Sequence, residues 1–101
     1  MALVRIATLD ELKPGTLLEY RSGESVAAVC NDGGTLHAFH GECPHLGGPL
    51  GQGNLADGNL ICPWHGWEFR CATGEADFNP NVKLERYAVV VRDGEVFIEI
   101  P

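Results

Sequence analysis

The chain has 101 residues, of which 45% are hydrophobic and 21% charged, and seven Lys and Arg against fourteen Asp and Glu give a formal net charge of −7. This length predicts one domain, residues 1–101, with a single small core and no space for a second catalytic domain. The acidic excess disfavours nucleic acid and anionic membranes as partners and favours a basic surface on another protein.

The N-terminal segment has no apolar core of the kind found in signal peptides. No apolar run along the chain reaches the roughly 18 residues that a transmembrane helix requires. We therefore expect a cytoplasmic protein without a membrane partner.

The first half of the chain predicts one short helix followed by three strands. Residues 8–11, Thr-Leu-Asp-Glu, have the form of a capping box, and the Pro-Gly pair at 14–15 would end the helix after one or two turns. Strands are expected over residues 16–20, 25–30 and 35–40, because the turns between them carry the Gly, Asn or Asp that hairpins need at positive φ. These predicted turns are residues 21–24 and 31–34.

The C-terminal residues give the clearest strand pattern. Residues 87–100 predict a hairpin around the Asp-Gly pair at 93–94. Its apolar face would consist of Val96, Ile98 and Ile100. Short strands at this spacing predict an all-β fold, a small antiparallel sandwich or barrel. The Gly- and Pro-rich residues 41–80 interrupt the pattern, and we expect them to form a smaller lobe inserted into this basal β domain.

Two pairs of candidate metal ligands lie in that lobe. Cys43 and His45 are two positions apart, Cys62 and His65 are three apart, and each pair is flanked by Pro and Gly. Such pairs suit tight loops, because proline fixes φ and glycine frees the backbone. Two thiolates and two neutral imidazoles would leave a diferric [2Fe–2S] cluster neutral, whereas four thiolates would make it a dianion. A neutral centre accepts an electron more readily, so histidine ligation raises the reduction potential.

The sequence around these pairs resembles the Rieske [2Fe–2S] proteins. Cys-x-His, sixteen intervening residues and Cys-x-x-His are present as CPHLGG and CPWHGWEF, and both TGEA at 73–76 and the closing VVVRDGEVFIEI look like that family. The resemblance implies that Cys43 and Cys62 bind one iron and that His45 and His65 bind the other. The residues it places around the cluster are Leu46, Gly47, Gly48, Trp64, Gly66, Trp67 and Pro80, the last in a third, shielding loop.

Two other uses of the cysteines stay open from the residues alone. Zinc also accepts two Cys and two His, although zinc modules usually pair like ligands and seldom carry so many glycines around them. A pair of disulfides would use all four cysteines, but an acidic chain without a secretion signal indicates a reducing compartment. We expect Cys30 and Cys71 to be buried thiols that pack as small apolar side chains.

Within the family it resembles, the chain is similar to the soluble ferredoxins. The branch in cytochrome bc complexes has a further cysteine in each loop, at the positions of Gly48 and Trp64, so the disulfide of that branch cannot form here. That branch also has a serine and a tyrosine where this chain has Trp67 and Phe69. Without those hydroxyl donors the reduced state is less stabilised, and we expect a potential on the order of −150 mV.

The resemblance implies an electron carrier that is not itself an enzyme. It would pass one electron from a flavin-containing NAD(P)H reductase to a terminal oxygenase that hydroxylates aromatic rings. We expect a monomer that binds both partners weakly, with Leu46 and Trp64 as an apolar docking rim. The alternative is a small Rieske-type subunit of an assimilatory nitrite reductase or another multi-component oxidoreductase. A mononuclear-iron oxygenase is disfavoured, because only His37 and His40, which we expect to be ordinary strand or loop residues, remain beside the ligands.

Overall fold

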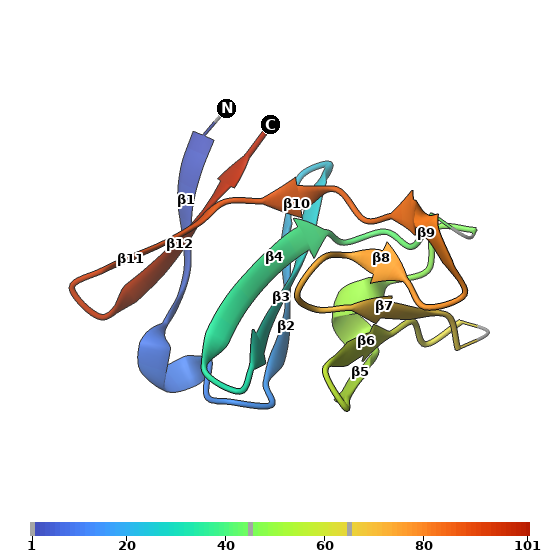
Figure 1. Cartoon of the computed structure of the whole chain (residues 1–101). Helices are drawn as coiled ribbons and strands as arrows, with labels where there is room; N and C mark the ends of the chain where they lie inside the picture. The colour runs from blue at the N-terminus through green and yellow to red at the C-terminus, as the bar shows by residue number, and fades with distance from the viewer. Residues whose placement is uncertain (1, 45, 65) are drawn as a thin grey trace.

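The computed structural model describes residues 2–44, 46–64 and 66–101, whose strands form three antiparallel sheets standing side by side (Figure 1). The outer sheet has the order β1 (Ala2–Thr8), β12 (Glu95–Ile100) and β11 (Val89–Arg92). The central sheet has the order β10 (Arg86–Tyr87), β4 (Thr35–His40), β3 (Ser25–Asp32) and β2 (Leu17–Ser22). The lobe sheet has the order β5 (Asn54–Ala56), β6 (Asn59–Ile61), β7 (Glu68–Arg70), β8 (Glu75–Ala76) and β9 (Asn79–Lys83). The predicted all-β antiparallel fold is confirmed.

The central sheet is buried on both faces, because alternate residues of its strands supply two separate cores. Val29 of β3 belongs to a cluster with Ile98 of the outer sheet. Its neighbour Ala28 points to the opposite face and belongs to a cluster with Leu60 and Phe69 of the lobe sheet. A strand buried on both sides reads as a continuous apolar run, which is the pattern of residues 26–30.

The predicted capping box is confirmed at the 3-10 helix η1 (Leu9–Glu11). The Glu11 N–H donates to Thr8 Oγ1 at 3.3 Å, and the Thr8 N–H donates to Glu11 Oε1 at 2.8 Å. The bond from the Thr8 backbone is the main reason that the pKa of Glu11 is lowered. A second 3-10 helix, η2 (Leu50–Gln52), precedes the lobe sheet. Neither of these short helices, nor any other helix in the described ranges, is long and apolar enough to cross a membrane.

The hairpin turns are tighter than predicted. The two glycines at 33–34, with φ of 62° and 106°, alone connect β3 to β4, so β3 continues past residue 30. The Asp-Gly pair at 93–94, with φ of 52° and 75°, connects β11 to β12 as predicted. Tyr87 does not begin this last hairpin. It lies in β10 opposite Ala38 of β4, which ties the end of the lobe to the central sheet.

Replacing Phe39 tests how much the core between the central sheet and the lobe sheet stabilises the fold. It is fully buried, whereas Phe78 is 60% exposed and meets the Trp67 ring edge-on. We expect Phe39→Ala to lower the free energy of unfolding by about 3–5 kcal/mol, and the same change at Phe78 by about 0.5–1.5 kcal/mol. Urea unfolding followed by circular dichroism measures both. Equal losses would contradict the assignment of the core.

Candidate metal centre

The two cysteine-bearing loops have the same backbone design. In each loop the cysteine N–H donates to the carbonyl oxygen five residues later, from Cys43 to Gly48 and from Cys62 to Trp67, with N to O distances of 2.8 Å. A proline follows each cysteine, and a glycine with φ of 75° or 72° lies four residues after it. These glycines are Gly47 and Gly66. The predicted tight loops are therefore confirmed.

Leu46 has a backbone conformation that leucine rarely adopts. Its φ of 62° lies in the left-handed region, where a side chain is strained. The neighbouring Gly47 N–H donates to the Cys43 carbonyl at 2.9 Å, which closes the turn around this residue. Strain of this kind persists where the surrounding structure enforces it, most often at functional sites. The loop thereby holds an apolar side chain that is 71% exposed close to Cys43.

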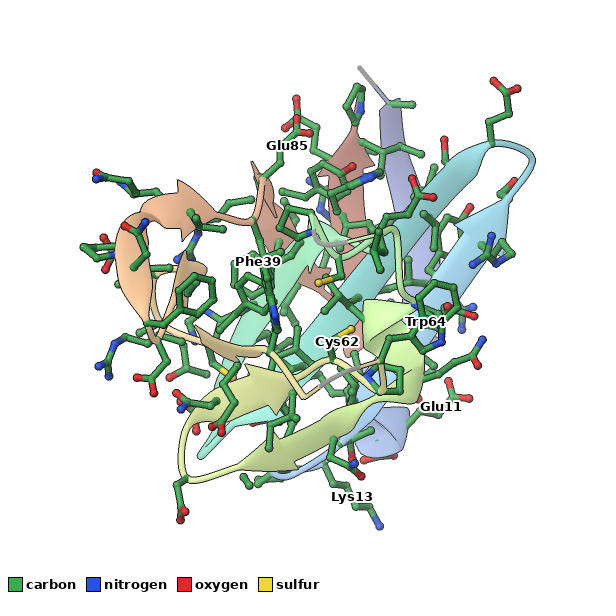
Figure 2. All side chains as sticks on the ribbon, turned by 90° about the vertical axis from the view of Figure 1, so that its right-hand side faces the viewer. Glu11, Lys13, Phe39, Cys62, Trp64 and Glu85 are labelled. Atoms are coloured by element: carbon green, nitrogen blue, oxygen red, sulfur yellow. The ribbon has the colours of Figure 1, made fainter. Side chains whose placement is uncertain are left out.

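Both cysteines are buried, and the two loops meet at Gly48. Cys43 is 2% exposed and Cys62 is 1% exposed. A Cβ added to Gly48 would lie 2.9 Å from Cys62 Sγ and 3.2 Å from the Trp64 ring. The backbone of the first loop therefore packs directly on the sulfur of the second, and the position has no room for a larger residue. Figure 2 shows Cys62 inside this end of the molecule with Trp64 beside it.

The histidines of both pairs, His45 and His65, lie outside the described residues. Their ligand roles, and the sharing of irons between the loops, stay predictions. Among the described residues, no group of three or more His, Cys, Asp and Glu side chains could hold a metal ion. Two buried sulfurs brought together on matched loops, each with a histidine nearby in sequence, form a donor set that suits an iron–sulfur cluster or zinc. The residues present therefore fit the predicted cofactor.

The other residues expected around the cluster differ in their surroundings. Trp64 is 47% exposed. Trp67 is half-buried, with its ring centroid 4.7 Å from that of Phe78 and 6.4 Å from that of Phe69. Pro80 does not lie in a loop: it is an exposed residue of β9, at the edge of the lobe sheet. An edge strand tolerates proline, because its missing N–H leaves no ladder bond unmade on the outer side.

A cavity of about 380 Å³ beside the first loop brings in residues that the sequence analysis missed. Its lining is His40, Glu42, Cys43, Pro44, Gly47, Lys83, Leu84 and Glu85. The chain after β9 reaches this cavity because the His40 N–H donates to the Glu85 carbonyl at 2.8 Å, just before β10 pairs with β4. No local pattern marks residues 83–85, so sequence reasoning had no signal for them.

His40 is anchored at both ring nitrogens. Nδ1 lies 3.1 Å from the Tyr87 hydroxyl, and Nε2 lies 3.2 Å from Glu42 Oε1. Burial, with a smaller contribution from the charge of Glu85, raises the pKa of Tyr87. The histidine thus bridges β10 and the start of the first cysteine loop.

Cys30 and Cys71 are buried thiols, as predicted. Because Cys62 is a thiol as well, the alternative of two disulfides is wrong. His37 is a strand residue of β4, also as expected, and is 7% exposed. Burial, and then the positive charge of Arg86, lowers the pKa of His37. The fold therefore disfavours the charged form of this histidine.

Comparisons with known proteins place the chain among proteins with a Rieske centre. The family model "Rieske [2Fe-2S] domain" matches residues 2–95. The chain is 32% identical over 101 residues to the ferredoxin component of biphenyl 2,3-dioxygenase from Rhodococcus jostii, a match that covers 99% of this chain and 94% of the relative. A structure described as the complex of reduced oxygenase and oxidised ferredoxin in carbazole 1,9a-dioxygenase contains a chain with a TM-score of 0.85 and 30% identity, covering 95% of this chain and 100% of that one.

Longer proteins also contain a similar segment. The chain is 31% identical over 94 residues to apoptosis-inducing factor 3 of Homo sapiens, and the match covers 92% of this chain but 16% of the relative. The chain therefore spans about a sixth of that relative's length. This kind of domain is used both as a small protein and as a part of larger ones.

The contact at Gly48 predicts the outcome of adding one methyl group. In Gly48→Ala the new Cβ would collide with Cys62 Sγ and the Trp64 ring, so we expect metal affinity to fall at least about 10-fold. Iron and acid-labile sulfide per chain, measured after dialysis against a chelator, report the effect. Gly23→Ala is the control, because its φ of 59° makes an added side chain strained although no atom lies within 4 Å, whereas Gly48 has the close contacts without a positive φ. Equal metal content in the two variants would contradict the loop contact.

Proposed function

The chain belongs to the Rieske [2Fe–2S] family, and on this basis we propose that it is a ferredoxin that carries single electrons between a flavin-containing NAD(P)H reductase and a terminal ring-hydroxylating oxygenase. The observation that carries the proposal is the pair of matched loops, which bury two cysteine sulfurs and expose Leu46 and Trp64 close to them. The similarity to a dioxygenase ferredoxin component over nearly the whole of both chains supports it.

The cofactor is a Rieske-type [2Fe–2S] cluster, which supplies uptake and release of one electron when bound. This excludes the zinc alternative. Cys43 and Cys62 would hold one iron from inside the lobe, where both side chains are buried. His45 and His65 would hold the other. Each loop would thus give one ligand to each metal.

The residues next to the ligands favour a low reduction potential. Phe69 is fully buried and apolar, and Trp67 has its indole N–H as its one donor group. Neither side chain carries the hydroxyl that would stabilise added negative charge on the cluster. With Gly48 and Trp64 in place of cysteines, no disulfide joins the loops, and the expected potential stays on the order of −150 mV.

The surface around the loops suits brief contact with a basic partner. Leu46 and Trp64 are exposed apolar side chains on the two loops, and exposed Glu42 and Glu85 line the neighbouring cavity. Lys83 lines the same cavity, but the two carboxylates outnumber it, and an apolar centre beside them matches a partner patch that is apolar with a positive rim. Opposite charges speed the encounter without requiring tight affinity, which a shuttle between two partners needs. We propose a cytoplasmic monomer that uses this face for both partners and, in this electron transfer, makes or breaks no covalent bonds itself.

The ligand assignment is tested by replacing one histidine. His65→Cys would put a third thiolate on the cluster and add negative charge, so we expect either loss of the cluster or a potential well below that of the wild type. Protein-film voltammetry and low-temperature EPR of the dithionite-reduced protein measure the two outcomes. His37→Cys is the control, since that residue lies in β4. A His65→Cys protein with the wild-type potential and EPR signal would overturn the assignment.

The docking face is tested with a matched pair of leucines. Leu46 is 71% exposed on the first loop, and Leu3 is 45% exposed on β1 of the outer sheet. Leu46→Ser should slow NADH-dependent reduction by the flavoprotein reductase of a dioxygenase system at least about fivefold, the effect of losing about 1 kcal/mol. Leu3→Ser should leave the rate unchanged. Stopped-flow absorbance of the cluster records both.

The alternative of a permanent oxidoreductase subunit gives a different result in the same experiment. A subunit locked in a large apolar interface would be reduced slowly as an isolated chain and would associate with itself or precipitate. Rapid reduction of a monomeric wild-type protein supports the carrier, and slow reduction of a self-associating protein would contradict it.

A further inference from the structure

Two cysteines that take no part in the metal centre lie in the core beneath the lobe. Cys30 of β3 is 0% exposed, and Cys71, which directly follows β7, is 1% exposed. Both belong to the cluster of buried residues that joins the central sheet to the lobe sheet. Cys30 lies opposite His37 in the pairing of β3 with β4, so these two side chains share the face that looks toward the lobe.

The two thiols interact with each other. A hydrogen bond between the side chains is the main influence on both: it raises the pKa of Cys30 and lowers that of Cys71. The physical reason is that the Cys30 S–H stabilises a thiolate on Cys71. Once Cys71 is a thiolate, its negative charge disfavours a second thiolate on Cys30. Burial disfavours both thiolates, the charge of Asp32 acts in the same direction, and the charge of Arg86 favours ionisation of Cys30. Ionisation is thus favoured at Cys71 rather than at Cys30.

Cys71 also lines a small cavity of about 140 Å³. The other lining residues are Gly15, Asn31, Asp32, Gly33, Leu55, Ala56, Asp57 and Gly58. A water molecule takes up about 30 Å³, so a molecule as small as hydrogen peroxide fits here. A bulky disulfide such as oxidised glutathione does not.

Both thiols are buried in one core cluster, and Cys71 shares its cavity with Asn31 and Asp32, the residues that follow Cys30 in β3. From this placement we propose that Cys71 and Cys30 are a peroxide-sensitive dithiol that closes to a disulfide between the central sheet and the lobe. The Cys71 sulfur attacks one oxygen of hydrogen peroxide, the O–O bond breaks, and the other oxygen takes a proton and leaves as water. Cys71 is then a sulfenic acid. The Cys30 sulfur attacks the Cys71 sulfur, the S–O bond breaks, and the departing hydroxide leaves as water with the Cys30 proton. The two thiols lose two electrons, and peroxide is reduced to two waters.

The position of this disulfide gives it a structural consequence. It closes the chain from residue 30 to residue 71, and both cysteine-bearing loops lie within that segment. The reduced protein holds the lobe on the central sheet without a covalent cross-link, through side chains such as Phe39 and Phe69. The oxidised protein would hold it by a covalent bond as well, which restricts the unfolded chain and stabilises the fold.

The experiment treats the cluster-loaded protein with one equivalent of hydrogen peroxide under argon and follows the visible absorbance of the cluster. Samples are unfolded in N-ethylmaleimide, digested and mapped by mass spectrometry. We expect a Cys30–Cys71 disulfide to form while the cluster absorbance persists. Bleaching of the cluster with Cys30 and Cys71 both alkylated, or a sulfonic acid on Cys71 without the disulfide, would overturn the proposal.

Single variants distinguish Cys71, the thiol that attacks peroxide, from Cys30, the thiol that closes the disulfide. In Cys30→Ser the sulfenic acid on Cys71 has no partner, so dimedone should label Cys71; in Cys71→Ser the Cys30 thiol should remain reduced. Oxidation should also raise the urea midpoint of the wild type, reversibly with dithiothreitol, and leave that of Cys30→Ser unchanged. Labelling of Cys30 in Cys71→Ser at the same rate would contradict the order of attack. None of these readouts depends on electron transfer to a partner.

Discussion

The two cysteine-bearing loops lie close enough to share one cofactor, as we propose, because Gly48 of the first loop has no side chain. Gly48 lies so close to Cys62 Sγ that an added Cβ would be 2.9 Å from the sulfur. Each loop is closed by a hydrogen bond from its cysteine N–H to the carbonyl five residues later, which fixes where the sulfur lies. The rest of the fold supports this contact, since the loops come from the two ends of a segment that includes β5 and β6.

The central sheet provides that support by being buried on both faces. One face packs on the outer sheet, and the other packs on the lobe through Phe39 and its neighbours. Arg86 of β10 adds a polar tie: its guanidinium lies over the Phe39 ring, 5.5 Å from the centroid, and donates to the Ala72 carbonyl. The lobe is therefore attached by apolar packing, by polar contacts such as that of Arg86 and, in our proposal, by a disulfide that forms under oxidation.

At the loop end of the molecule, the buried side chains and the exposed side chains have different roles. The cysteine sulfurs are inside, where low solvation favours a cluster without net charge, while Leu46 and Trp64 are outside. In our proposal Glu42 and Glu85, which line the cavity beside the first loop, speed the approach of a basic partner surface. Cys30 and Cys71 are buried in the same core cluster as Cys43 and Cys62, and Cys71 lines a separate cavity.

The sequence by itself determined the features that depend on neighbouring residues: the ligand spacing of the two Cys/His pairs, the capping box at Thr8, and the Asp93-Gly94 turn of the last hairpin. These are local, because proline, glycine and hydrogen bonds over a few residues enforce them. Only the tertiary structure decided that Glu85 approaches the first loop, that Tyr87 pairs with β4, that Pro80 lies in a strand, and that Cys30 meets Cys71. Those contacts depend on sheet pairing and on the stacking of layers between distant segments, which no single stretch of sequence encodes.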